Sequence, residues 1–93
     1  MTVLDEDAVR AALAADLPTW ELREGRLQRE LTFADFAEAF AFLTRVALVA
    51  QRRNHHPDLW CSWNRVRLSI VSHAEGGVTD QCVALATAID ALQ

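Results

Sequence analysis

The sequence predicts an α+β domain in which a four-stranded antiparallel sheet carries three helices on one face. Segments with helical periodicity alternate with pairs of short extended segments in the order α-β-β-α-β-β-α. A short turn joins the two members of each extended pair, so each pair closes locally as a hairpin. The chain has 93 residues, of which 52% are hydrophobic, and can therefore bury one core. We expect a single domain over residues 1–93.

A first helix is expected over residues 5–17. Its apolar residues recur at the spacing of one helical face: Val9, Ala12, Leu13 and Leu17. Acidic residues at its start complement the positive end of the helix dipole, and Pro18 ends it. The first hairpin follows, with extended segments over 20–22 and 26–31 around a turn at Glu24-Gly25.

The central helix is expected from Phe33 to Arg53, with Thr32 as its N-cap because Asp35 follows three residues later. It carries two neighbouring apolar stripes, one of Phe36, Phe40, Leu43 and Ala47 and one of Ala39, Phe42, Val46 and Val49. Packing on one sheet requires a single apolar face about 100° wide. The surplus stripe therefore predicts contact with another subunit, and the alternative is a helix buried deep within its own domain.

The central helix should end before Pro57, because the residue that precedes a proline is driven out of the α region. A strand over 59–63, a tight turn at Asn64-Arg65 and an alternating strand over 65–71 then form the second hairpin. The last helix begins after Thr79 as N-cap. Its apolar stripe consists of Val83, Ala86, Ile89 and Leu92.

Charge and hydropathy exclude two classes of partner. A net charge of −4 argues against direct nucleic-acid binding, which usually needs a basic face. The apolar runs are too short for a membrane span, and the acidic N-terminus lacks the features of a signal peptide. We therefore expect a soluble cytoplasmic protein in which Cys61 and Cys82 remain unpaired thiols.

All three histidines lie in two segments, Asn54-His55-His56-Pro57 and residues 72–79, where regular elements give way to turns. Histidine is the side chain that exchanges protons near neutral pH, so His55, His56 and His73 predict a proton-transfer site. The alternative is that the histidine pair caps the helix or lies in a solvated turn.

Two other chemistries are open to the same side chains. The three histidines together with Cys61 and Cys82 are all zinc-ligand types, although their spacing matches no usual structural zinc pattern. Nucleophilic catalysis by Cys61 is disfavoured, because an interior strand position is typical of a packed, inert thiol.

The combination of these phrases resembles the pterin-4a-carbinolamine dehydratase family. The resemblance rests on Asn54-His55-His56-Pro57, Trp63, Ser72-His73 and Gly76-Gly77-Val78-Thr79, and it extends upstream through Trp20, Gly25-Arg26 and most of 36–47. It implies three helices on one side of a four-stranded antiparallel sheet. It also implies homodimers formed through the sheet and homotetramers formed through the central helices, which would account for the surplus apolar stripe.

The resemblance further implies dehydration of a 4a-hydroxytetrahydropterin, a step in recycling a tetrahydrobiopterin-type cofactor. Carried over by position, His55 and His73 are the acid/base candidates, with the division of the two roles left open, and His56 helps to bind and orient the pterin. The substrate-binding positions that it implies are Asn54, Pro57, Trp63 and Ser72. No metal and no organic cofactor is implied.

The sequence departs from the family pattern at two positions. Gln51 stands where members usually have an acidic residue, and Cys82 stands where they usually have an aspartate. A carboxylate favours the charged form of a neighbouring histidine, and neither replacement carries that charge. Asp80 would substitute only if the helix start were shifted, and Glu75 offers a carboxylate in the turn. We expect an active but slower dehydratase, and the alternative is a non-enzymatic pterin-binding or dimerisation module.

Overall fold

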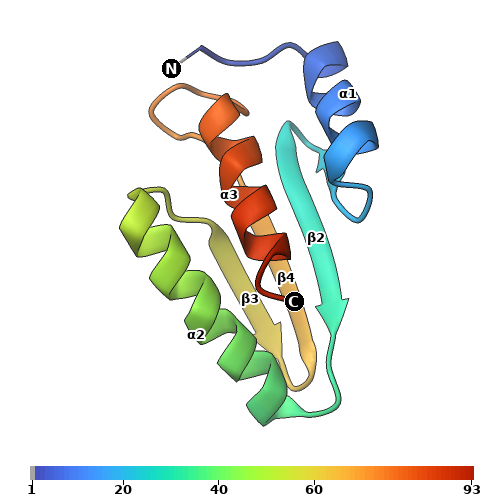
Figure 1. Ribbon diagram of the computed structural model, residues 1–93, viewed down its shortest axis with the longest axis vertical. Coiled ribbons are helices and arrows are strands. Elements are labelled where there is room, and N and C mark those ends of the chain that lie inside the picture. The colour runs from blue at the N-terminus through green and yellow to red at the C-terminus, as the bar shows by residue number, and fades with distance from the viewer. Residues whose placement is uncertain (1) are drawn as a thin grey trace.

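The computed structural model describes residues 2–93 and confirms the order α-β-β-α-β-β-α (Figure 1). The helices are α1 (Glu6–Asp16), α2 (Phe36–Arg53) and α3 (Asp80–Asp90). The strands are β1 (Glu21–Arg23), β2 (Arg26–Thr32), β3 (Asp58–Ser62) and β4 (Arg65–Ile70). They form one antiparallel sheet in the order β1-β2-β4-β3, so the second strands of the two hairpins pair at its centre. The predicted fold class is therefore correct.

The core lies between the helices and one face of the sheet. Strand residues alternate strictly in β4, where Val66, Leu68 and Ile70 are buried while Arg65 and Arg67 are exposed. This alternation sends every second side chain of a strand to the same face. We call the polar face, which carries Arg65 and Arg67, the open face of the sheet; α2 and α3 cover the opposite face (Figure 1).

The two apolar stripes of α2 have different surroundings. Ala39, Phe42, Val46 and Val49 are buried in the core. In the other stripe Leu43 is buried, but Phe36 and Phe40 are 51% and 54% exposed and their rings contact each other. A helix buried on all sides is therefore excluded, because Phe36 and Phe40 of the other stripe lie outside the core. Among the helices of residues 2–93, none combines the length and apolar character that a membrane span requires.

Three local predictions were wrong. Thr32 is the last residue of β2, and the N-cap of α2 is Asp35, whose carboxylate accepts a hydrogen bond from the Glu38 N–H at 2.8 Å.

The tight turn of the second hairpin consists of Trp63 and Asn64, one residue earlier than expected. Asn64 exchanges hydrogen bonds with the backbone of Phe33, which fixes that turn. Cys61 lies on β3, an edge strand, and is only half-buried.

Candidate active site

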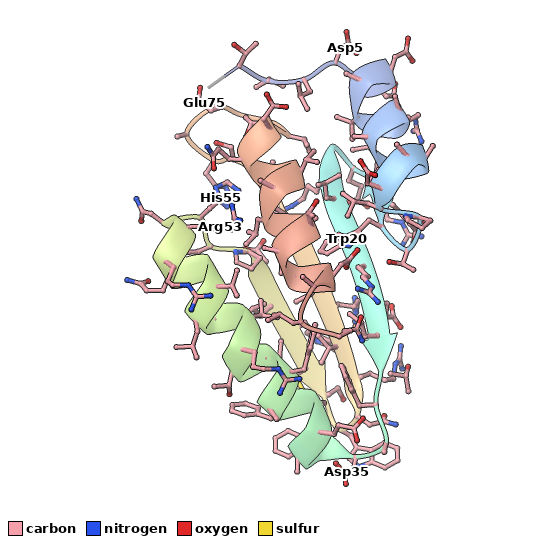
Figure 2. The ribbon with its side chains drawn as sticks, viewed as in Figure 1. Asp5, Trp20, Asp35, Arg53, His55 and Glu75 are labelled. Carbon is pink, nitrogen blue, oxygen red and sulfur yellow. The ribbon has the colours of Figure 1, made fainter. Side chains whose placement is uncertain are left out.

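Three chain segments meet at one end of the molecule: the C-terminus of α2, the turn after β4 and the start of α3 (Figure 2). Asn54 ends α2 in the left-handed conformation, with φ of 50°, and its N–H donates to the carbonyls of Ala50 and Gln51. Asparagine tolerates this conformation better than other non-glycine residues. The chain reverses here and leads through His55 and His56 into β3, which begins at Asp58.

The turn after β4 is held by Ser72. Its hydroxyl accepts a hydrogen bond from the Glu75 N–H at 3.2 Å, and its backbone pairs with Gly77. Gly76 has φ of 79°, a conformation that glycine adopts without a steric penalty. Ser72 is buried and His73 next to it is exposed, so the turn presents the imidazole of His73 at the surface.

His55 contacts the first turn of α3. Its Nε2 lies 3.3 Å from the sulfur of Cys82, and that sulfur lies 3.6 Å from the hydroxyl of Thr79. Cys82 and Thr79 are buried, whereas His55 is half-buried. Burial lowers the pKa of His55, and the neighbouring charges of His56 and His73 lower that pKa further. The neutral imidazole of His55 is therefore favoured.

His56 contacts the last turn of α2 instead. Its Nε2 lies 3.0 Å from Oε1 of Gln51, five residues earlier. Adjacent residues in a turn point in different directions, and this geometry gives each histidine its own partner. His73 completes the group, because its charge acts on His55 across the site. The structure thus brings the three predicted catalytic residues together.

The substrate-binding residues carried over by resemblance divide into two groups. Asn54, Pro57 and Ser72 flank the histidines in sequence and lie at the same end of the molecule. Trp63 lies in the β3–β4 turn, at the opposite end of the hairpin, and is 67% exposed. The structure does not bring Trp63 together with the histidines of its own chain.

Asp80 does not take the place of an acid at position 82. It is the first residue of α3 and is exposed, so the helix start is not shifted. Two residues along a helix correspond to a rotation of about 200°, which turns Asp80 away from the face that carries Cys82. Thr79 is the predicted N-cap, but its side chain makes no capping hydrogen bond.

The metal alternative finds no support in the geometry. Within residues 2–93, no group of three or more histidine, cysteine or acidic side chains is arranged to hold a metal ion. Cys61 lies on β3 with its sulfur 3.8 Å from the Trp63 carbonyl, and the histidine that Cys82 contacts is His55.

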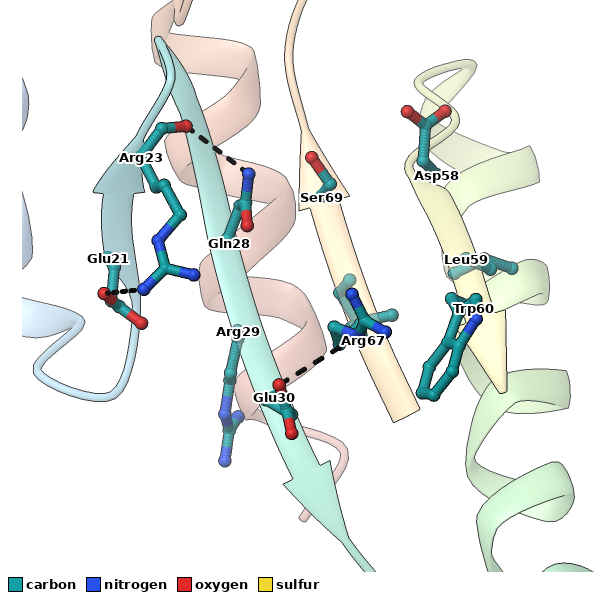
Figure 3. Close-up of a pocket in the computed structure, with 11 residues that line it drawn as sticks. Glu21, Arg23, Gln28, Arg29, Glu30, Asp58, Leu59, Trp60, Arg67 and Ser69 are labelled. Carbon is teal, nitrogen blue, oxygen red and sulfur yellow. Dashed lines mark hydrogen bonds and ion pairs between the residues drawn. The ribbon is translucent and has the colours of Figure 1, made fainter. Parts of the chain in front are cut away.

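A second polar region lies on the open face of the sheet, away from the histidines (Figure 3). A hollow of about 350 Å³ is bounded there by side chains of all four strands, including Glu21, Glu30, Trp60 and Arg67. Arg67 lies 3.9 Å from the ring centre of Trp60. Sequence reasoning missed this region; the signal was the alternation of arginine with apolar residues in β4.

Comparison with known proteins identifies the family. The profile of the family described as "Pterin 4 alpha carbinolamine dehydratase" matches residues 2–92. The chain belongs to this family. A relative from Synechococcus sp. is 46% identical over 92 residues, covering 99% of both chains, and one from Mycolicibacterium vanbaalenii is 40% identical, covering 99% and 98%. Both carry the provisional name pterin-4-alpha-carbinolamine dehydratase.

The pterin-4-alpha-carbinolamine dehydratase fold is also found in solved structures. A crystal structure from Brucella melitensis, described as a transcriptional coactivator/pterin dehydratase, matches with a TM-score of 0.91 and 31% identity. The match covers 98% of each chain. In the chain described here, Gln51 contacts His56 and Cys82 contacts His55. The two positions expected to depart from the family pattern therefore lie next to the histidines.

Proposed function

We propose that the protein dehydrates a 4a-hydroxytetrahydropterin to the quinonoid dihydropterin, as in recycling of a tetrahydrobiopterin-type cofactor. The observation that carries the proposal is the grouping of His55, His56 and His73 at one end of the sheet in a member of the dehydratase family. Two free cysteines are in keeping with a cytoplasmic location, where thiols stay reduced.

The reaction needs one acid and one base. The bond from C4a to the hydroxyl breaks as a proton is delivered to that oxygen, and water leaves. A proton is removed from the neighbouring ring nitrogen, and the electron pair of that N–H bond forms the new double bond. No electrons are gained or lost overall, so the step requires neither an oxidant nor a reductant.

We assign the base to His55, because its lowered pKa keeps the imidazole neutral and able to accept a proton. His73, which is exposed on the facing turn, is assigned as the acid. His56 binds and orients the pterin, with Asn54, Pro57 and Ser72 shaping the edge of the site. Trp63 would join such a site only from a second subunit, since it lies at the far end of its own hairpin.

The test is dehydration of a 4a-hydroxypterin generated in situ. We expect the wild type to exceed the uncatalysed rate, and His55→Ala and His73→Ala each to lose about 10²- to 10⁴-fold, the usual contribution of a positioned acid or base. Because Gln51 supplies no carboxylate to His56, the wild type should be a slower catalyst than a Gln51→Glu variant. Background rates for all forms would contradict the proposal and favour a non-enzymatic pterin-binding or dimerisation module.

We also propose that the protein is a homodimer or homotetramer, with the exposed strip of α2 in a subunit contact. The strip consists of Phe36, Phe40 and Ala47, and it adjoins an apolar hollow against Leu59 and Cys61. Contiguous exposed apolar patches are typical of protein–protein contact surfaces. Light scattering should give a dimer or tetramer for the wild type and a smaller species for Phe40→Glu.

Ala41→Glu is the matched control for this variant. Ala41 is exposed on α2 outside both apolar stripes, so the same added charge there should leave the assembly unchanged. A wild type that is monomeric at micromolar concentration would contradict the proposed assembly.

A further inference from the structure

We propose that Cys82 is a positioning residue for His55: its sulfur accepts the Nε2–H of the imidazole, and this leaves Nδ1 as the basic atom without adding a charge. The inference rests on the proposed dehydratase function and deepens it. It concerns how the base is held and which of its two nitrogens reacts.

Cys82 is buried between two polar groups. It is the third residue of α3, fully buried, with its sulfur between His55 Nε2 at 3.3 Å and Thr79 Oγ1 at 3.6 Å. Buried polar atoms are almost always paired, and these contacts satisfy both Cys82 and the buried hydroxyl of Thr79. The hydroxyl of an N-cap threonine usually bonds the helix backbone, but in Thr79 it faces the sulfur instead.

The hydrogen bonds of Cys82 with His55 and Thr79 can each run in either direction. A thiol both donates and accepts, and so does a hydroxyl. If His55 is the base, its free lone pair must face the substrate. The imidazole then donates from Nε2 to the sulfur, and the S–H of Cys82 donates to Thr79 Oγ1. Nδ1 of His55 has no hydrogen-bond partner among residues 2–93 and remains to accept the proton.

The charges around His55 also favour its neutral form. His56 and His73 are the groups whose charges act on His55, and Cys82 faces it from α3. Both histidine charges oppose protonation of His55, and the thiol supplies no negative charge to offset them. A carboxylate at position 82 would accept the same Nε2–H but would favour the imidazolium. Cys82 thus preserves the orientation of a base while keeping it neutral.

His56 shows the same arrangement on a second element. Gln51 Oε1 lies 3.0 Å from Nε2 of His56, and an amide oxygen accepts a hydrogen bond without bearing a charge. Nδ1 is again the nitrogen without a partner among the described residues. The agreement between the two contacts indicates that Nδ1 is the working atom of both adjacent histidines.

The experiment compares Cys82→Ala, Cys82→Ser and Cys82→Asp with the wild type by nuclear magnetic resonance titration of the histidines and by the pH profile of kcat/KM. We expect Cys82→Asp to raise the pKa of His55 and to shift the acidic limb of the profile to higher pH by the same amount. Cys82→Ala should lower kcat roughly tenfold or more with little change in KM, because small misplacements of a catalytic group can cost about 10²-fold. Cys82→Ser should recover most of the loss, because its hydroxyl accepts the same bond.

Cys61→Ser is the matched control. Within the described residues 2–93, the hydrogen bond of Cys61 goes to the Trp63 carbonyl and not to a histidine, so its substitution should change neither the titration nor the pH profile. Thermal melting of each variant separates a folding defect from a change at the site. If Cys82→Asp does not fold, the test rests on Cys82→Ser. In that variant the nitrogen chemical shifts of His55 must show the same tautomer as in the wild type.

The outcomes that overturn the proposal are specific. An unchanged His55 titration in every folded Cys82 variant would show that the thiol does not hold the imidazole. A thiolate absorbance that titrates together with an imidazolium would show an ion pair in place of the neutral contact. Titration does not depend on turnover. If the Cys82 variants change the titration of His55 but the wild type shows no dehydration, the proposed function is refuted and the Cys82–His55 hydrogen bond is established.

Discussion

The histidine end and the open face of the sheet are both rich in ionisable side chains, but the two regions pair them differently. On the open face, Arg65 bonds Glu30 at 2.9 Å. Arg67 lies 4.0 Å from the same carboxylate (Figure 3). At the histidine end, His55 and His56 are held by a thiol and an amide, which carry no charge.

The difference indicates which region can change its protonation during a reaction. A group paired with an opposite charge is held in its ionised form, whereas an imidazole with an uncharged partner can gain and lose a proton. The sheet face also has a hollow of about 350 Å³, yet none of the three histidines lines it. The partners of the titratable groups are therefore a better guide to chemistry here than the presence of a hollow.

The largest expected contrast between the two regions is in activity. Replacement of His73 by Gln removes an acid, so kcat/KM should fall by about 10²- to 10⁴-fold. Replacement of Arg67 by Gln removes an ion pair on the open face and should leave kcat/KM unchanged. Equal losses in the two variants would place the reaction on the open face of the sheet and contradict the comparison.

The next effect concerns the backbone that aims the histidines. Asn54→Ala puts an ordinary side chain into the left-handed conformation and should cost about 1–2 kcal/mol of unfolding free energy, measured by urea denaturation. Asn54→Gly is the control, because glycine adopts this conformation freely and should be at least as stable. If both variants equalled the wild type, the left-handed cap would not contribute to stability.

A smaller effect is expected from the ion pairs of the open face. Glu30→Gln breaks the contacts with Arg65 and Arg67, which are about half exposed, so the loss should be at most about 1 kcal/mol. The difference from the wild type should shrink as salt is added, because exposed charges are screened. A larger, salt-independent loss would show that the carboxylate acts through packing.

The smallest effect is the pH dependence of stability due to His55. Its pKa is lower in the folded chain than in the unfolded chain, so the unfolded chain binds more protons between the two values. Its stabilising contribution is complete above the ordinary histidine pKa of about 6.5 and is lost as the pH falls toward the folded-state pKa. His55→Gln should flatten this slope in urea titrations. A slope that steepens in the variant would contradict the direction of the shift.

The secondary-structure elements and the family could be predicted from the sequence alone. Helical periodicity, the break before Pro57 and the turn at Glu24-Gly25 depend on neighbours a few residues apart, and all were predicted correctly. The cap of α2 was not, because both Thr32 and Asp35 are suitable N-cap residues. Pairing of β2 with β4 extends the strand through Thr32 and leaves Asp35 to begin the helix.

The side chains that hold the histidines become visible when the chain is folded. Position in the family pattern marked Gln51 and Cys82 as missing carboxylates, which implied a loss. The fold shows them as hydrogen-bond partners, one across a helix turn and one on α3, 27 residues from His55. The opposite holds for Trp63. It is close to His55 and His56 in the sequence, but it lies at the far end of the β3–β4 hairpin. A sequence pattern records spacing along the chain, whereas hydrogen bonds depend on distances that exist only after the sheet has closed.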